Sequence, residues 1–258
     1  MFAIISDIHS NIEALTAVLE DIDKRGIKTI HCLGDIVGYG PNPKECLDLV
    51  MAKTEVCIMG NHDHATLYEP TNFNTGAERA ALWTRFELET EPDKELLDKR
   101  MHFLINLPMR HHMELKLDGS HAHLEFVHAS PRKPIHEYVF PDDAFSSSPK
   151  LGLIFNRVHH ICFIGHTHLP GVFLDDPDFY TADELDSVYP IIEDERAIIN
   201  VGSVGQPRDG DTRASYAYVE GNEVHFVRVK YDMEKTIEKI YSIDGLDNFE
   251  ADRLREGK

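Results

Sequence analysis

The segment FAIISDIH, residues 2–9, decides the architecture of this chain: an apolar run leads directly into serine, aspartate and histidine. Four later segments repeat this design, each with an apolar run of strand length followed closely by Asp, Asn or His. They are TIHCLGD (29–35), VCIMGNHD (56–63), LEFVH (124–128) and ICFIGHTH (161–168). Runs of this kind predict strands of a parallel or mixed sheet in an α/β fold.

The polar ends of the five segments are expected to meet in space. In open α/β sheets, ligands bind beyond the carboxyl ends of the strands, which is where each polar cluster falls. Residues i and i+2 of an extended segment point the same way, so Asp7 can act with His9, and His166 with His168. A single Asp-x-His is a weak signal, but five clusters at equivalent positions predict one common site.

The segments between the runs predict alternating helices and strands at the start of the chain. Asn11 can cap a helix over about 12–25, and a second helix is expected to end near residue 51. The resulting β-α-β-α-β order favours a right-handed parallel core.

A helical region over about 75–106, interrupted near Pro92, predicts a small helical cap within residues 66–108, beside the site. Trp83 and Phe86 in this region are expected to pack in the cap core rather than to form a base-stacking platform.

Residues 1–230 are expected to form the main domain, and residues 231–258 a C-terminal helix (about 233–241) and a polar tail. Other expected features are hairpins over 110–127 (turning at 117–120) and 215–229, a loop over 131–149 and an exposed excursion over 175–195.

Length and composition limit the classes of protein to which the chain can belong. With 258 residues, 42% of them hydrophobic, it can build one large core, and its formal net charge is -19. An acidic surface repels long nucleic acid, although nucleotides and phosphoproteins remain possible substrates. No signal segment or membrane span is apparent, so a cytoplasmic protein without membrane association is expected. Core packing, not disulfide or zinc binding, is expected for the four cysteines, Cys32, Cys46, Cys57 and Cys162.

The residue types at the strand ends predict a metal site. They combine carboxylate, amide and imidazole groups without cysteine, which suits Mn, Fe, Co, Ni or Zn. The candidate ligands are Asp7, His9, Asp35, Asn61, His128, His166 and His168. Asp35 is the central acid available to bridge two cations, and Asn61 adds a neutral oxygen that leaves the site positive enough to attract phosphate. His62 follows a ligand asparagine, so it is expected at the site edge, where a general acid belongs.

These motifs, in their order, resemble those of the calcineurin-like metallophosphoesterases, and the resemblance covers residues 1 to about 208. It implies a four-layer α/β/β/α sandwich of two mixed sheets. It also implies two bound divalent transition-metal ions, with Mn, Fe or Zn preferred and Co or Ni as alternatives. It further implies that metal-activated hydroxide attacks phosphorus, with His62 as the catalytic acid. The implied ligands are Asp7, His9, Asp35 and His168 for one ion, and Asp35, Asn61, His128 and His166 for the other.

The chain departs from this family pattern after Gly34-Asp35. The family's protein phosphatases and diadenosine tetraphosphate hydrolases carry Asp-Arg-Gly where this chain has Gly38-Tyr39-Gly40. The closer resemblance is to the small prokaryotic phosphoesterases of the superfamily. Arg208, at the end of a Gly- and Pro-bearing loop, is the candidate replacement phosphate contact, and Tyr39 is a second candidate for substrate binding.

A phosphatase or phosphodiesterase acting on phosphorylated small molecules, nucleotides or phosphoproteins is therefore the leading hypothesis. The alternatives are a Ser/Thr-type protein phosphatase, a dinucleoside polyphosphate hydrolase, and a non-catalytic metal-binding interaction module. A nuclease is disfavoured because the chain is acidic and lacks a basic stripe.

Overall fold

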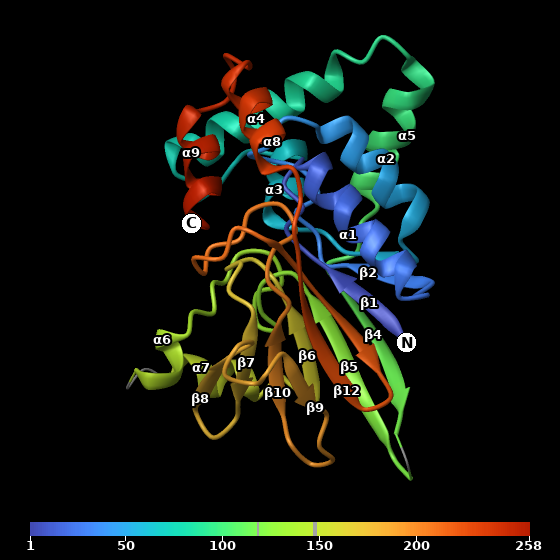
Figure 1. Cartoon of the computed structure of the whole chain (residues 1–258), viewed down its shortest axis with the longest axis vertical. Coiled ribbons are helices and arrows are strands. Elements are labelled where there is room, and N and C mark those ends of the chain that lie inside the picture. Colours follow the sequence, from blue (N-terminus) through green and yellow to red (C-terminus); the bar gives the residue numbers. More distant parts are fainter. Residues whose placement is uncertain (118, 147–148) are drawn as a thin grey trace.

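The computed structural model describes residues 1–117, 119–146 and 149–258, which build two six-stranded mixed sheets (Figure 1). Asp118, in the predicted turn at 117–120, and residues 147–148, in the predicted loop, lie outside the described residues. The first sheet has the order β3-β2-β1-β11-β12-β9, and the second has the order β4-β5-β6-β10-β7-β8.

The first sheet contains the three N-terminal strands, which pair in parallel, with β11 antiparallel to β1. Its strands are β1 (Phe2–Ile5), β2 (Thr29–Cys32), β3 (Val56–Cys57), β9 (Val188–Pro190), β11 (Ala214–Glu220) and β12 (Glu223–Val229). In the second sheet, β5, β6 and β10 are parallel neighbours. Its strands are β4 (Arg110–Lys116), β5 (His121–Val127), β6 (Ile161–Ile164), β7 (Gly171–Leu174), β8 (Asp178–Thr181) and β10 (Ala197–Asn200). All five predicted apolar runs contain strands.

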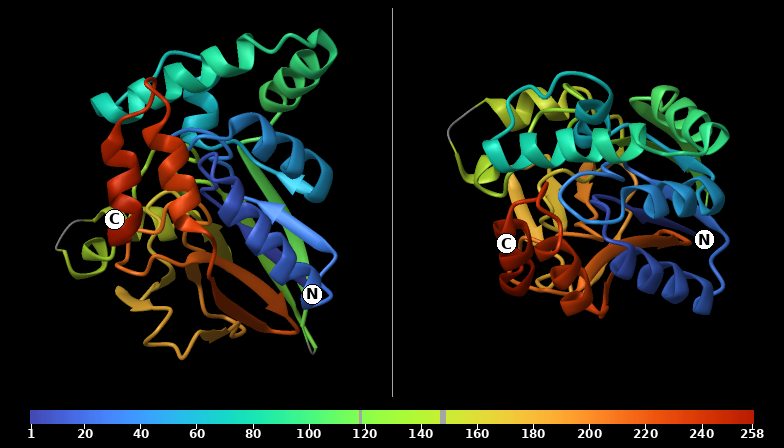
Figure 2. Two further views of the ribbon diagram at one scale, coloured as in Figure 1. Left: turned by 45° about the horizontal axis from the view of Figure 1, so that its top comes forward. Right: turned by 90° about the horizontal axis from the view of Figure 1, so that it is seen from above.

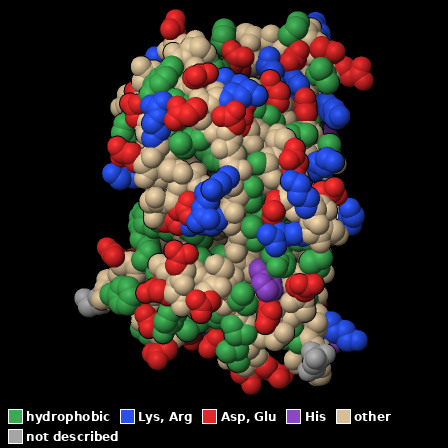
Figure 3. Space-filling view, in the orientation of Figure 1, with side chains coloured by type: hydrophobic (Ala, Val, Ile, Leu, Met, Phe, Trp, Pro, Cys, Tyr) green, Lys and Arg blue, Asp and Glu red, His purple; other side chains and the backbone are tan. Residues whose placement is uncertain are grey.

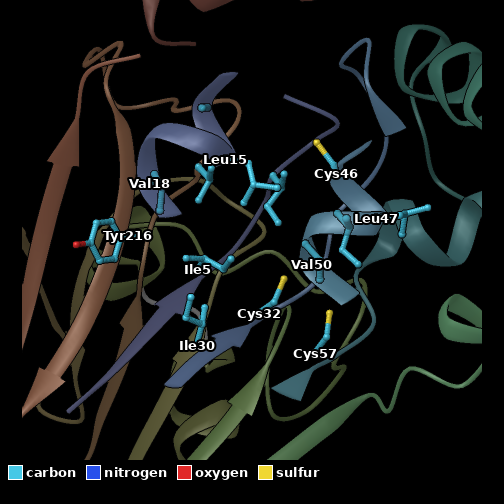
Figure 4. Close-up of a cluster of buried hydrophobic side chains, with 14 of the residues drawn as sticks. Ile5, Leu15, Val18, Ile30, Cys32, Cys46, Leu47, Val50, Cys57 and Tyr216 are labelled. Atoms are coloured by element: carbon cyan, nitrogen blue, oxygen red, sulfur yellow. The ribbon is translucent and has the colours of Figure 1, made fainter. Parts of the chain in front are cut away.

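Helices and sheets form four layers. Helices α1 (Ile12–Lys24) and α2 (Pro43–Lys53) contribute to an apolar cluster with the first sheet, which Figure 4 shows around Ile5, Leu15 and Val50. A second cluster, containing Ile4 and Phe163, joins the inner faces of the two sheets. On the outer face of the second sheet lie α6 (Asp142–Phe145) and α7 (Lys150–Phe155). This arrangement confirms the expected α/β/β/α sandwich, in which all four cysteines are free and buried.

The region expected to form a cap, residues 66–108, contains α4 (Thr75–Glu89) and α5 (Lys94–Ile105), and α3 (Asn61–Leu67) ends at its start. Helix α5 is tied to α2 because the Arg100 guanidinium donates to both carboxylate oxygens of Asp48, at 3.0 and 2.7 Å. Of the two aromatic residues expected in its core, Trp83 is partly buried, whereas Phe86 is 60% exposed. The core interpretation is therefore wrong for Phe86, which lies on the outward face of α4.

The C-terminal segment forms two helices. Helix α8 (Met233–Tyr241) lies where it was predicted, but the segment expected to be a polar tail forms α9 (Asn248–Glu256). Ala251 and Leu254 of α9 are buried in one apolar cluster with residues of α4 and α8. Figure 2 shows these last helices beside α4. Burial of a few apolar side chains in tertiary contacts orders this polar sequence, which its own composition does not predict.

Two other segments expected to be irregular contain regular structure. Within 175–195, β8 pairs with β7 at the edge of the second sheet, and β9 pairs with β12 at the edge of the first. The expected excursion is thus a connection between the sheets, and the expected loop over 131–149 includes α6. In the described part of the chain, none of the helices has both the length and the apolar character needed to cross a bilayer. Figure 3 shows Lys and Arg side chains dispersed among acidic ones on one face.

Candidate metal centre

The polar residues that follow β1, β2, β3, β5 and β6 meet at one end of the sandwich. Because three of these strands belong to the first sheet and two to the second, both sheets contribute to the site. Two groups have side-chain nitrogen and oxygen atoms within 4.8 Å of one another: Asp7 with His9 and His168, and Asp35 with His128 and His166. The Asn61 side-chain oxygen lies 3.0 Å from His128 Nε2. The fold therefore brings together all seven predicted ligand residues.

Three of the histidines are oriented by main-chain carbonyl oxygens. The contacts from Nδ1 are His9 to Val37 at 3.2 Å, His128 to Leu33 at 2.9 Å and His168 to Gln206 at 2.6 Å. A carbonyl oxygen can only accept, so each Nδ1 must carry the proton that it donates. In the neutral ring, Nε2 then presents a lone pair, which is the form that binds a metal.

These lone pairs face other acceptors at short range. His9 Nε2 lies 3.1 Å from His168 Nε2, and His168 Nε2 lies 3.1 Å from an Asp7 carboxylate oxygen. His128 Nε2 lies 3.3 Å from an Asp35 oxygen. Lone pairs this close repel unless a proton or a cation lies between them. Two nitrogens at this separation can both reach one ion at about 2.0–2.1 Å, so the residues fit a transition-metal centre.

The two carboxylates in the centre are fully enclosed: Asp7 is 0% exposed and Asp35 is 1% exposed. Within the described residues, their ion pairs are with histidines alone. Burial opposes ionisation of Asp7, but His168, His128 and Ser6 together outweigh burial and hold the Asp7 pKa below its usual range. Likewise, burial opposes protonation of His128, yet Asp35 raises the His128 pKa to about 9. The centre therefore stabilises positive charge among its carboxylates.

Several of these residues have backbone conformations that are uncommon for side chains other than glycine. Positive φ angles occur at Asp7 (53°), His9 (47°), Asp35 (51°), His166 (67°) and His168 (63°). Such angles cost free energy and persist where the surrounding structure enforces them, often at functional sites. Space is also restricted, since a Cβ at Gly60 would lie 2.1 Å from an Asp35 carboxylate oxygen.

Asp63 holds the loop that carries Asp35. Its buried carboxylate accepts four backbone N–H groups, from Asp35 at 2.8 Å, Ile36 at 3.0 Å, Val37 at 3.3 Å and Gly60 at 3.0 Å. Burial and the nearby Asp35 charge raise the Asp63 pKa to about 7. Since its oxygens are occupied by the backbone, Asp63 positions the loop and does not orient the adjacent His62 ring.

His62 lies against the candidate ligand His9, with ring centroids 4.9 Å apart, and is 3% exposed. Its ring packs between Tyr39, with centroids 4.3 Å apart, and Phe73, at 4.7 Å. Its backbone N–H donates to Asp35 at 2.8 Å, while Nδ1 is buried without a hydrogen-bond partner among the described residues. Burial lowers the His62 pKa to about 4. One ring nitrogen also forms a third close group with His9 and Asp35.

The predicted substrate-binding residues border the same centre. The Tyr39 ring lies 4.8 Å from the His9 ring, and the Arg208 guanidinium carbon lies 5.9 Å from the Tyr39 centroid. Arg208 donates to the Gln206 side-chain oxygen at 2.7 and 3.2 Å, and the described residues include no carboxylate ion-paired with it. Burial lowers the His168 pKa most, and the nearby Arg208 charge lowers it further. Arg208 thus places an unpaired positive charge near the candidate ligands.

Sequence reasoning missed two residues that border the centre. Tyr138 stacks on His166 with centroids 4.0 Å apart, and Arg253 of α9 lies 6.0 Å from the Tyr39 centroid. A clue to Tyr138 exists in the sequence, since it follows the ligand-bearing strand β5 by a short connection. Arg253 has no local motif, and only the packing of α9 brings it close.

Comparison with known proteins agrees with this geometry. The family model described as the calcineurin-like phosphoesterase superfamily domain matches residues 1–223. An uncharacterized protein from Methanocaldococcus jannaschii is 40% identical over 248 residues, covering 93% of this chain and 91% of the relative.

Two solved structures match over the full length of the chain. A metallophosphoesterase from Sphaerobacter thermophilus has a TM-score of 0.76 and 35% identity, with coverage of 100% of this chain and 98% of that one. A hypothetical protein from Pyrococcus horikoshii shares the fold, with a TM-score of 0.73, 20% identity, and coverage of 100% and 99%. Because the family model spans most of the sequence, the chain belongs to the calcineurin-like phosphoesterase superfamily.

Proposed function

We propose that this protein is a dinuclear-metal-dependent phosphoester hydrolase, a phosphatase or phosphodiesterase. The observation that carries the proposal is the convergence of two Asp/His groups in which three imidazoles are fixed with Nε2 lone pairs facing inward. Membership of a phosphoesterase superfamily supports the same reaction class.

The proposed ligand sets follow the two groups. Asp7, His9 and His168 would hold one ion. The second ion would be held by His128, His166 and Asn61, with Asp35 shared between the ions. Asp35 suits the shared position because one of its oxygens lies 3.7 Å from His9 Nε2 and 3.3 Å from His128 Nε2. Two divalent cations, when bound, supply an activated water near neutral pH and neutralise charge on the phosphoryl group; Mn, Fe or Zn suits the donor set, with Co or Ni as alternatives.

His62 would act on the leaving group. Its pKa, lowered by burial, leaves the imidazole neutral near pH 7 before substrate binds. A dianionic phosphoryl group beside the ring favours the protonated form, because an opposite charge raises a histidine pKa. His62 can then donate a proton to the leaving oxygen as that oxygen separates from phosphorus.

Arg208 and Tyr39 would form the side of the site that contacts the substrate phosphate. Among the described residues, Arg208 hydrogen-bonds the Gln206 side-chain oxygen and forms no ion pair with a carboxylate. Its guanidinium can donate two hydrogen bonds to phosphoryl oxygens. Burial raises the Tyr39 pKa to about 12, so its hydroxyl stays protonated and able to donate.

The alternative is a non-catalytic metal-binding module on the same fold. One experiment separates the two: chelator-stripped protein receives Mn²⁺ and is assayed with p-nitrophenyl phosphate and bis-p-nitrophenyl phosphate. We expect metal-dependent release of p-nitrophenol from at least one substrate, and loss of this activity in Asp35→Asn. Two bound equivalents of metal without hydrolysis of either ester would favour the module. The ratio of the two rates distinguishes a monoesterase from a diesterase.

A further inference from the structure

Three aromatic rings form a ladder that leads from the candidate metal centre to the surface. The Tyr138 ring stacks on His166 with centroids 4.0 Å apart and planes 21° apart. Phe140 stacks on Tyr138 with centroids 5.3 Å apart and planes 5° apart. The innermost ring belongs to a candidate ligand, so the ladder forms a wall of the site.

The two outer rings of this ladder are exposed although they are large. Tyr138 is 43% exposed and Phe140 is 44% exposed. Single exposed aromatic residues are common, but two parallel rings extending from a buried polar centre are the kind of apolar wall that lines ligand sites. Aromatic faces of this type bind other planar rings by offset stacking.

The loop that carries the ladder is held by its own contacts. Ser130 donates to Glu137 at 2.6 Å, and Arg132 contacts both carboxylate oxygens of Glu137. Val139, between the two aromatic residues, is 1% exposed and anchors the segment in the apolar cluster of the second sheet. The rings are therefore positioned before any ligand arrives, which reduces the entropy cost of stacking.

Tyr138 borders the candidate ligand His166 and carries a hydroxyl on the ring that stacks there. This hydroxyl makes no hydrogen bond within residues 1–117, 119–146 and 149–258. It is free to donate to a substrate oxygen, and the ring that bears it leads directly to Phe140.

We propose that Tyr138 and Phe140 form a stacking wall for a nucleobase, so that the substrates are nucleoside phosphates rather than sugar phosphates or phosphorylated side chains. This inference rests on the proposed phosphoesterase function. A ring bonded to phosphate through a single oxygen, as in phosphotyrosine, would lie beside Tyr138. Phe140 lies one ring farther out, 5.3 Å from Tyr138, which suits a base separated from its phosphate by ribose.

The sharpest test compares adenosine 5′-monophosphate with ribose 5-phosphate, since the two carry the same ester and differ only in the base. Stacking of a base on aromatic side chains predicts a kcat/KM about 5- to 100-fold higher for the nucleotide in the wild type. Phe140→Ala should remove most of this preference, because it should lower kcat/KM far more for the nucleotide than for ribose 5-phosphate, while Phe140→Trp should keep the preference.

A matched control is Phe86→Ala, because Phe86 is a 60% exposed phenylalanine on α4, outside the ladder. Its nucleotide preference should equal that of the wild type. If the protein hydrolyses only diesters, the p-nitrophenyl esters of adenosine 5′-monophosphate and ribose 5-phosphate replace the pair, and the same ratios are expected.

Equal kcat/KM for nucleotide and sugar phosphate in the wild type would overturn the stacking wall while leaving the phosphoesterase function intact. So would an unchanged preference in Phe140→Ala, or a higher kcat/KM for a phosphotyrosine peptide than for the nucleotide. If no phosphoester is hydrolysed, the proposed function fails first. Calorimetry with Mn²⁺-loaded protein then tests the stacking wall separately. The stacking wall requires the nucleotide to bind more tightly than ribose 5-phosphate, and it requires Phe140→Ala to lose that difference.

Discussion

Asp63→Asn should be among the most destabilising conservative substitutions in this protein. Each Asp63 carboxylate oxygen accepts two backbone N–H groups, and the residue is 0% exposed. Asparagine keeps one acceptor oxygen but replaces the other with an amide nitrogen that can only donate. Two backbone donors would then face a third donor inside the protein, with no solvent to replace the lost acceptor.

The magnitude follows from the two lost bonds. Each buried donor left without an acceptor costs about 1–3 kcal/mol, so Asp63→Asn should lower the free energy of unfolding by about 2–6 kcal/mol. This is a large fraction of the roughly 5–15 kcal/mol that stabilises a typical domain. The loop from Asp35 to Val37 should loosen first, because three of the four donors lie in it.

Urea unfolding at pH 8 measures the effect, because this pH lies above the Asp63 pKa of about 7 and keeps the wild-type carboxylate mostly ionised. Asp23→Asn makes the same chemical change at a side chain that is 79% exposed, and its unfolding midpoint should match that of the wild type. A decrease below about 1 kcal/mol for Asp63→Asn would refute the reasoning and mean that the loop finds other acceptors.

Four further predictions concern the centre and the fold. Asp35→Asn should lower the occupancy of both metals, and two full equivalents by elemental analysis would contradict its shared position. His62→Ala should keep both metals but lose about 10²–10⁴-fold in turnover, and this loss should be smallest for a good leaving group such as p-nitrophenolate. Loss of a metal from the variant would instead make His62 a ligand. Arg208→Ala should reduce kcat/KM by about 10- to 100-fold at unchanged metal content, with partial recovery in Arg208→Lys, and wild-type kinetics would exclude a phosphate contact. Burial lowers the His31 pKa from 6.5 to about 4 in the folded protein. As pH drops from 6.5 to 4, His31 therefore takes up a proton in the unfolded chain before it does so in the folded protein, and wild-type stability falls. His31→Phe should remove up to about 3 kcal/mol of that loss in the free energy of unfolding, measured with urea between pH 6.5 and 4. The same pH dependence of stability in the variant and the wild type would refute this prediction.

The candidate ligands could be predicted from sequence because their positions follow local rules. An apolar run of strand length ends where the backbone leaves the sheet, so Asp7 after β1 and His166 after β6 fall at strand ends whatever lies around them. The apolar runs also predict the strands themselves, and the β-α-β order of elements predicts the parallel pairing of β1 with β2. The protein's superfamily was likewise apparent from these motifs.

The C-terminal helix α9 shows where local rules stop. Its sequence is polar, with acidic and basic residues mixed along it, and composition alone predicts a tail. Its order comes from Leu254 and Ala251 packing with residues distant in sequence, such as Ala77 and Ala80 of α4. The exposure of Phe86 was also misjudged, since an aromatic residue in a helix does not by itself reveal which face is covered.

Strand length and side-chain chemistry are local properties, so the amino-acid sequence alone identifies the residues that offer nitrogen and oxygen ligands and the strand ends at which they lie. The three-dimensional packing was needed to find that Asp63 holds a loop rather than the His62 ring, and that Tyr138 and Arg253 border the centre. Those outcomes depend on distances between segments far apart in the chain. Such distances are set by the packing of two sheets and their helices around a shared core, which no single segment encodes.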